Sequence, residues 1–266
     1  NVIESNPEIS MIDSDKFVLS RWKNDTSLIA RLGTIVGGTI VFEDEIVIVP
    51  SGGATGKQGQ VAINSSGLFL AYIDPNDGYQ AKGRILTVSG STLSSGTEYI
   101  IDANDNSLFG SNCEIPCEKI TSDTIAIGRQ NFAVSGTHVQ LIYLNDTIIT
   151  PGPISQSITT DVSFNNTYIE RMSDTRFIIG HQRSNSPRDY KVTIIRIDND
   201  SLSIRSQVEV NVSLSFFDEG INIRSFGDNK LLVFYPKSTP IYHIYGQIAN
   251  LIPSSDIFAS DESIYD

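Results

Sequence analysis

The sequence lacks several residue types and patterns, and each absence excludes a class of protein. Only two of its 266 residues are cysteines, so a small core held by many disulfides is excluded. No apolar run reaches the roughly 18 residues that a membrane-spanning helix needs. No window of eleven residues keeps the apolar spacing of a helix without a Gly, Pro or Asn-Asp interruption. We therefore expect no membrane span and almost no helix.

Basic residues are also scarce, with 19 Lys and Arg against 31 Asp and Glu, which gives a net charge of −12. Such a charge repels nucleic acid and anionic membrane surfaces, so we expect neither as a partner. The 39% of apolar residues is enough for a sizeable core and excludes intrinsic disorder as the main state. Asn1 is not a start methionine and no leader pattern follows it, so we expect a processed chain or an excerpt.

Short runs of Ile, Val, Phe, Tyr and Thr are abundant, and Ser, Asp, Asn and Gly clusters separate them. This is the pattern of strands and tight turns. A polar turn followed by an apolar triplet occurs five times, with spacings of 51, 57, 52 and 54 residues. The triplets are Phe17-Val18-Leu19, Leu68-Phe69-Leu70, Ile125-Ala126-Ile127, Phe177-Ile178-Ile179 and Leu231-Leu232-Val233.

Each copy predicts four antiparallel strands. The first strands are expected at Ile9 to Ile12, Val61 to Ile63, Lys119 to Ile120, Tyr168 to Met172 and Ile221 to Ser225. Four strands repeated at about 50 residues predict an all-β fold, a five-bladed β-propeller in one domain over 1–266. The blades are expected at about 8–50, 58–102, 115–159, 166–212 and 219–266, with the segment after Pro253 as a candidate last outer strand. A β-sandwich is the main competitor, but the near-constant period favours the propeller.

The sequence contains no recognisable catalytic constellation. The three histidines lack metal-ligand spacing, and there is no nucleophile elbow, phosphate-binding loop or SxxK motif. Glycosidases use paired carboxylates, and the first strands offer Glu8, Asp13 and Glu170. No spacing selects an acid and its partner among them, so we interpret these as solvated carboxylates and expect a non-enzymatic protein.

One column of the repeat carries a long or planar polar side chain in every copy. It lies four residues after the start of each triplet and consists of Arg21, Tyr72, Arg129, His181 and Tyr235. At one mouth of a closed propeller these residues could form a ring that binds an anion or a sugar. Packing between blades is the alternative, and it is favoured.

The cysteines lie close together as Cys113 and Cys117, and a small-loop disulfide is favoured over two free thiols. Oxygen-rich segments at Asp102 to Asn106 and at Asp74, Asn76 and Asp77 resemble partial calcium loops. Asn and Asp also dominate ordinary turns, which is the favoured interpretation. We therefore expect no metal and no cofactor.

Six N-x-S/T sequons are present, at Asn24, Asn64, Asn145, Asn165, Asn199 and Asn211. Five fall in predicted turns or connectors, where N-linked glycans are accepted, whereas Asn211 falls in a predicted strand. This placement predicts a secreted or surface-exposed glycoprotein, with uninformative Asn-rich turns as the alternative.

The repeat, with hairpins such as Gly33-Thr34-Ile35-Val36-Gly37-Gly38, resembles the blades of secreted and surface-displayed propellers, both lectin-like and appendage or filament modules. The resemblance spans about residues 8–260 and implies extracellular recognition or scaffolding. The repeated sugar pockets of such lectins are missing, since Trp22 is the only tryptophan.

Two functional hypotheses follow. The first is a non-enzymatic extracellular structural or adhesive module, such as a filament subunit, whose partners are other subunits that pair through its termini or loop faces. The alternative is a propeller that binds or hydrolyses carbohydrate at its central mouth.

Overall fold

The computed structural model consists of strands and contains no helix among the residues it describes. These residues are 5–23, 26–51, 56–78, 80–102, 115–131, 136–145, 148–154, 158, 168–182, 188–198, 201–214, 222–225, 230–238, 242–252 and 257–264. From residue 206 onward only the backbone is described, except at Arg224. Within these ranges no helix is long and apolar enough to cross a membrane.

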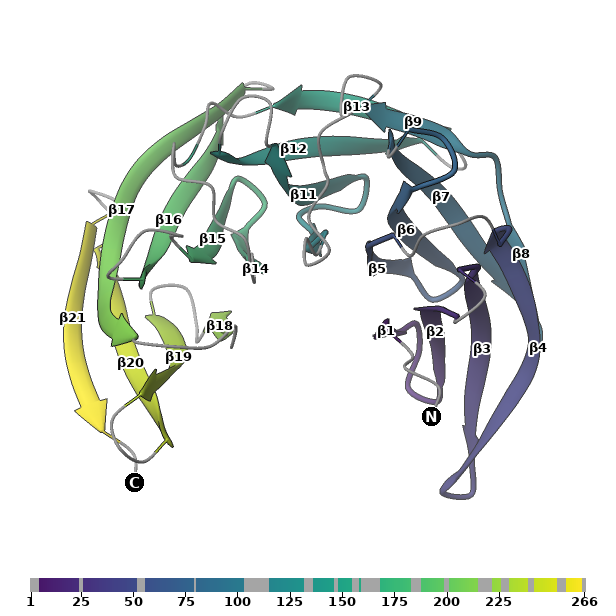
Figure 1. Cartoon of the computed structure of the whole chain (residues 1–266), viewed down its shortest axis with the longest axis horizontal. Coiled ribbons are helices and arrows are strands. Elements are labelled where there is room, and N and C mark those ends of the chain that lie inside the picture. The colour runs from purple at the N-terminus through teal and green to yellow at the C-terminus, as the bar shows by residue number, and fades with distance from the viewer. Residues whose placement is uncertain are drawn as a thin grey trace. The chain divides into compact units, whose positions relative to one another are not determined.

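The strands form five antiparallel sheets, each built from consecutive segments of the chain (Figure 1). The first has the order β1-β2-β3-β4 and comprises Ser5–Met11, Lys16–Trp22, Leu28–Val36 and Thr39–Val49. The second has the order β5-β6-β7-β8, with β9 also paired to β7, and comprises Gln58–Asn64, Gly67–Asp74, Gln80–Ser89, Thr92–Ser95 and Tyr99–Asp102. The third has the order β10-β11-β12-β13 and comprises Cys117–Lys119, Thr124–Asn131, Gly136–Asn145 and Ile148–Ile154.

The last two sheets repeat the same order. The fourth, β14-β15-β16-β17, comprises Tyr168–Ser173, Arg176–Gln182, Arg188–Asp198 and Ser201–Leu214. The fifth, β18-β19-β20-β21, comprises Asn222–Ser225, Lys230–Ser238, Tyr242–Ile252 and Ile257–Ile264. Strand β21 pairs with β20 along its whole length, so the segment after Pro253 contributes the outer strand of its own sheet, as the sequence suggested.

Local sequence explains the hairpins. Strands β3 and β4 turn at Gly37 and Gly38, which have φ angles of 57° and 80°, a conformation that residues with a Cβ rarely adopt. In β3, a Cβ on Gly33 would come within 2.3 Å of the Phe17 ring on β2. The glycine therefore leaves room for the aromatic side chain of the first triplet.

The four triplets whose side chains are described form the core of their sheets, as their pattern predicts. The side chains of Val18, Leu68 and Leu70 are fully buried, and they join Trp22 and Tyr72 in one cluster that the first and second sheets share. The triplets in β11 and β15 are buried in the same way. Burial of this kind contributes roughly 25 cal/mol per Å² of apolar surface.

By internal contacts the chain divides into two compact units. The first is Asn1–Ser111, Thr121–Ile125 and Ile142–Pro151, and the second is Asn112–Ile120, Ala126–Leu141 and Gly152–Asp266. The first and second sheets lie in the first unit and the fourth and fifth in the second, while the residues of the third sheet are divided between them. The expected all-β class with four-stranded antiparallel sheets is confirmed, whereas the blade number and the single domain over 1–266 stay predictions.

Candidate functional site

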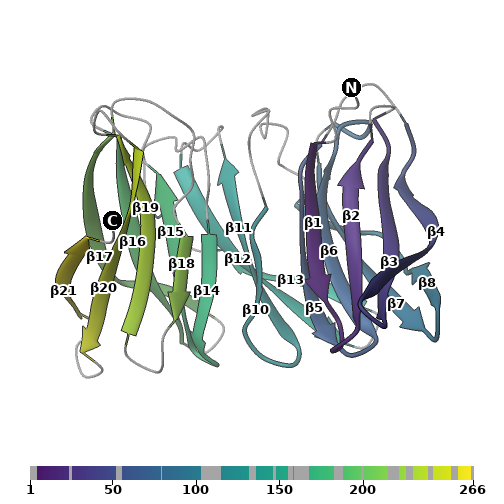
Figure 2. The same cartoon turned by 90° about the horizontal axis from the view of Figure 1, so that it is seen from below.

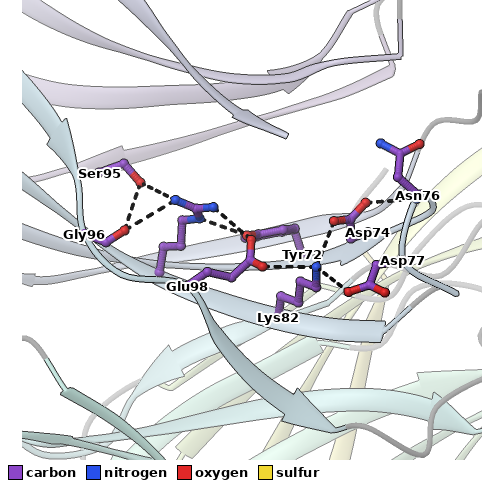
Figure 3. A network of polar contacts seen from close by, with 9 residues as sticks. Tyr72, Asp74, Asn76, Asp77, Lys82, Ser95, Gly96 and Glu98 are labelled. Atoms are coloured by element: carbon purple, nitrogen blue, oxygen red, sulfur yellow. Dashed lines mark hydrogen bonds and ion pairs between the residues drawn. The ribbon is translucent and has the colours of Figure 1, made fainter. Parts of the chain in front are cut away.

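The second sheet holds a dense polar network around Tyr72, one of the five residues of the predicted ring (Figure 3). Tyr72 on β6 is fully buried, and its hydroxyl contacts the Glu98 carboxylate and accepts a hydrogen bond from Arg84 Nε at 3.0 Å. Arg84 on β7 also pairs with Glu98 at 2.9 Å. The Tyr72 hydroxyl is therefore held by side chains of its own sheet, and its place in a ligand ring stays a prediction.

Lys82 on β7 is the cation at the centre of this network. Its side chain is only 6% exposed, and Nζ lies 2.9 Å from Asp77, 3.0 Å from Asp74 and 3.0 Å from Glu98. Burial alone would lower the pKa of Lys82, but hydrogen bonds to the three carboxylates outweigh it and raise the pKa. An ammonium group thus occupies the place that the sequence offered as a partial calcium loop at Asp74 and Asp77.

The same contacts shift the pKa values of Glu98 and Tyr72. Burial alone would raise the pKa of Glu98, yet hydrogen bonds from Tyr72, Arg84 and Lys82 lower it. Burial and the Glu98 carboxylate raise the pKa of Tyr72, which stays a neutral donor. The charged groups of this network are already paired with one another. The network holds the segment that leads into β9 against β7, so we interpret its role as structural.

The other predicted ring positions are only partly described. Arg21 on β2 is half-buried. Arg129, His181 and Tyr235 belong to β11, β15 and β19, and their side chains lie outside the described residues. A common ligand ring stays a prediction for all five residues.

Several other expectations also fall partly outside the described residues. Cys117 lies in β10 with Sγ 3.4 Å from the Ile115 carbonyl oxygen, but Cys113 is not described, so the disulfide stays a prediction. The same holds for the candidate calcium segment after Asp102. Among the sequons, Asn64 and Asn145 are exposed at the ends of β5 and β12, and Asn211 belongs to β17, as predicted. Asn24, Asn165 and Asn199 lie outside the described residues.

A second polar cluster, the inner-strand cluster, lies in the second unit and is formed by Glu118, Tyr168, Glu170 and Arg224. These residues belong to β10, β14 and β18, the first strands of three successive sheets (Figure 2). β14 packs against both β10 and β18. The fold therefore brings Glu118 and Arg224 into one cluster, although they are 106 residues apart in sequence.

Arg224 joins the aromatic and acidic members of the cluster. Its Nη1 pairs with Glu170 Oε2 at 3.3 Å, and its guanidinium carbon lies 5.0 Å from the centroid of the Tyr168 ring. The Tyr168 hydroxyl donates to the same Glu170 oxygen at 3.2 Å. The Arg224 side chain is 54% exposed, so solvent reaches this cation–π and ion-pair arrangement.

Glu118 is a carboxyl group of the cluster with a raised pKa. Burial, followed by the negative charge of Glu170, raises the pKa of Glu118 to about 7. The backbone N–H of Arg171 and the charges of Arg224 and Arg171 oppose this shift without cancelling it. Glu118 therefore exchanges its proton near neutral pH, which few carboxyl groups do, and such groups concentrate at functional sites.

Sequence reasoning found one member of this cluster and missed the others. Glu170 was recognised as a first-strand carboxylate, but it was interpreted as solvated. Glu118 was missed because the expected strand began at Lys119, whereas β10 is Cys117–Lys119. Arg224 did fall in a predicted first strand, yet no sequence signal places it beside Tyr168, 56 residues earlier.

Comparison with known proteins supports the fold and assigns no family. No protein-family model and no curated protein sequence matches the chain. Similar solved structures include the fucose-specific lectin from Aleuria aurantia, with a TM-score of 0.53 and 11% identity over 97% of this chain and 77% of that one. The SapL1 lectin in complex with α-methyl fucoside has a TM-score of 0.58 and 9% identity over 97% and 79%. A candidate 6-phosphogluconolactonase from Bacteroides fragilis has a TM-score of 0.62 and 11% identity over 96% and 69%.

At these identities the likeness is one of fold. Together with the five sheets, it defines the chain as an all-β propeller similar to lectin propellers.

Proposed function

We propose that this chain is a non-enzymatic carbohydrate-binding propeller and that the inner-strand cluster holds the saccharide. This was the alternative hypothesis from the sequence, and the resemblance in fold to fucose-binding lectins supports it above the structural one. The observation that carries it is the exposed Arg224 guanidinium, paired with Glu170 and stacked on Tyr168.

The chemistry of a sugar matches this arrangement. Neighbouring hydroxyls of a saccharide both donate and accept hydrogen bonds, and its C–H faces are apolar. A carboxylate accepts, a guanidinium donates through a rigid fork, and an aromatic ring packs against C–H groups. Because Tyr168 and Arg224 already hold Glu170, the acceptor is positioned before any ligand arrives, which lowers the entropic cost of binding.

Replacing Arg224 tests the proposal. We expect wild-type protein to bind a member of a saccharide panel that includes α-methyl fucoside, measured by calorimetry. Arg224→Gln should weaken that binding by roughly 10- to 100-fold, since hydrogen bonds to charged groups contribute about 1.5–3 kcal/mol. The matched control is Arg205→Gln, which removes an exposed arginine paired with Asp198 at 2.6 Å elsewhere in the same unit.

Two results would refute saccharide binding at this cluster. One is a folded wild-type protein that binds nothing on a broad glycan array, and the other is equal affinity of the Arg224 and Arg205 variants. Release of reducing sugar from a bound glycan would instead refute the non-enzymatic part of the proposal.

An extracellular, glycosylated location accompanies the proposed function. Exposed sequons at Asn64 and Asn145 support it, because oligosaccharyl transfer requires accessible backbone. We expect the secreted protein to carry glycans at both sites, seen as mass shifts that a glycosidase removes. Unmodified peptides spanning both asparagines in protein isolated from its native source would contradict this.

The structural or adhesive module is retained as a second candidate function because of one observation. Strand β4 exposes large apolar side chains along an outer sheet edge, a feature that soluble proteins usually avoid.

A further inference from the structure

Strand β4 is the outer strand of the first sheet, and in the described part of the chain no strand pairs with its outer side (Figure 1). It is eleven residues long, from Thr39 to Val49. An edge strand presents a row of backbone N–H and C=O groups, which is a template for pairing with another chain. The length of β4 makes that template unusually large.

Two other outer strands, β8 and β13, carry protection that β4 lacks. β8 is only four residues long, and β13 contains Pro151 and Pro153, which cannot donate to a ladder. β4 has neither proline nor lysine, the residues that commonly blunt an edge. The outer strands β17 and β21 lack both residues as well, so an unblocked edge is not peculiar to β4.

The hairpin arm of β4 is apolar and exposed. Ile40, Val41 and Phe42 follow one another with 54%, 47% and 40% of their surfaces exposed. They pair with Ile35, Thr34 and Gly33 of β3 in a regular register. Apolar side chains therefore point to both faces next to the open backbone edge, as a strand-binding site requires.

An acidic segment ends this apolar arm. Glu43, Asp44 and Glu45 follow Phe42 at a register shift between β3 and β4. Lys23 pairs with Glu45 at 3.0 Å on the surface, and Arg31 donates to the Glu43 backbone carbonyl at 3.0 Å while lying over the Phe42 ring. Three acids and two cations leave this end of the arm with a net negative charge of one, and an occupant should be basic here.

We propose that the β4 edge from Thr39 to Glu45 docks an extended segment of another protein, antiparallel to β4, in which basic residues precede alternating apolar ones. The basic residues lie opposite Glu43 to Glu45 and the apolar residues opposite Ile40 and Phe42. A second copy of this chain fits less well, because its net charge is −12 and its own β4 carries the same acids. Anionic lipid is disfavoured for the same reason.

Two synthetic peptides test the proposal: KTKVTVTV as the matching probe and ETEVTVTV as its charge-reversed control. We expect the wild-type protein to bind the first at least tenfold more tightly, with new protection of the Thr39–Phe42 amides against hydrogen exchange. Asp44→Lys should remove most of that preference, since Asp44 is exposed and central to the acidic segment. Asp174→Lys, which changes an exposed acid in the second unit, should leave the preference intact.

Four other outcomes would overturn the proposed docking of a basic peptide at the β4 edge. Equal loss with Asp44→Lys and Asp174→Lys would show only general attraction of a basic peptide to an acidic protein. Amide protection outside β4 would place the peptide elsewhere. Concentration-dependent dimerisation that protects β4 would make a second copy the occupant, and β4-dependent binding to phosphatidylcholine vesicles would make it a lipid surface. These results are independent of saccharide binding at Arg224.

Discussion

Lys82→Met should destabilise the first unit by about 3 kcal/mol or more. The variant leaves Asp74, Asp77 and Glu98 facing one another without the ammonium that now contacts all three within 3.0 Å. Removing one partner of a buried ion pair typically costs about 3–5 kcal/mol, because an uncompensated charge remains. Asp77 is largely exposed, so water will screen part of that charge.

The measurement is urea unfolding followed by fluorescence. Trp22 is the only tryptophan of the chain, is 1% exposed, and packs in the same apolar cluster as Tyr72, so its emission reports on this unit. Lys23→Met is the matched control, since Lys23 pairs with Glu45 on the surface and exposed pairs contribute about 0–1 kcal/mol. If both variants shifted the midpoint equally, the network would not have the structural role assigned to it.

The pH dependence of the Lys82 variant gives a second check. Hydrogen bonds from Tyr72, Arg84 and Lys82 lower the pKa of Glu98, so the stabilisation that Lys82 provides there is lost as Glu98 becomes protonated. The deficit relative to wild type should therefore shrink as the pH falls toward 4. A deficit that is constant between pH 4 and 8 would indicate lost packing of the lysine stem rather than lost charge compensation.

The repeat was predictable because its signal is local. The four apolar triplets whose side chains are described lie in buried strands, and the polar turns before them mark hairpin ends. Both follow from alternation and turn chemistry within a few residues. The same locality explains why the segment after Pro253 could be assigned to an outer strand. The fold class could thus be derived without any long-range information.

The polar clusters were not predictable in the same way, because their members come from different strands and sheets. The repeat places Tyr72 in a column that could bind a ligand or, as favoured, pack between blades, but it gives no sign that Lys82, Arg84 and Glu98 enclose this residue. Only the register of β6 with β7, in which Tyr72 lies opposite Lys82, puts these groups on one face. The residues of a column share a position in the repeat, yet their neighbours differ from blade to blade.

The two proposed surfaces have different physical characters and would serve different partners. The inner-strand cluster combines charge, hydrogen-bonding groups and one aromatic ring, which suits a small polar ligand. The β4 edge offers backbone groups and apolar side chains over several residues, which suits an extended chain. A propeller that recognises glycans through one surface and attaches to another protein through a second would unite both functional hypotheses.

Glu118→Gln should stabilise the second unit at pH 8 and leave its stability nearly unchanged at pH 4. The folded protein raises the pKa of Glu118 from an ordinary 4.5 to about 7 through burial and the charge of Glu170. The folded state therefore binds this proton more tightly than the unfolded state does. Stability linked to Glu118 is fully present below pH 4.5 and is lost as the pH rises to about 7.

A glutamine stays neutral at every pH, so the difference between variant and wild type should grow from near zero at pH 4 to about 3 kcal/mol at pH 8. Urea unfolding followed by far-ultraviolet circular dichroism measures it at each pH. Glu170→Gln gives the reciprocal test, because removing the like charge should move the pH at which stability is lost downward. A wild-type protein whose stability is flat between pH 5 and 8, with Glu118→Gln parallel to it, would contradict the raised pKa.

The same titration should appear in saccharide binding if the inner-strand cluster holds the ligand. Below pH 7 the protonated Glu118 can donate a hydrogen bond beside the Glu170 acceptor, whereas above pH 7 it becomes a second carboxylate next to the first. Affinity for a neutral sugar should then fall between pH 6 and 8 in the wild type. It should stay constant in Glu118→Gln, whose amide keeps a donor at all pH values. If the wild-type affinity did not depend on pH, Glu118 would not contact the ligand. The predicted effect of Glu118 on stability would be unaffected by that result.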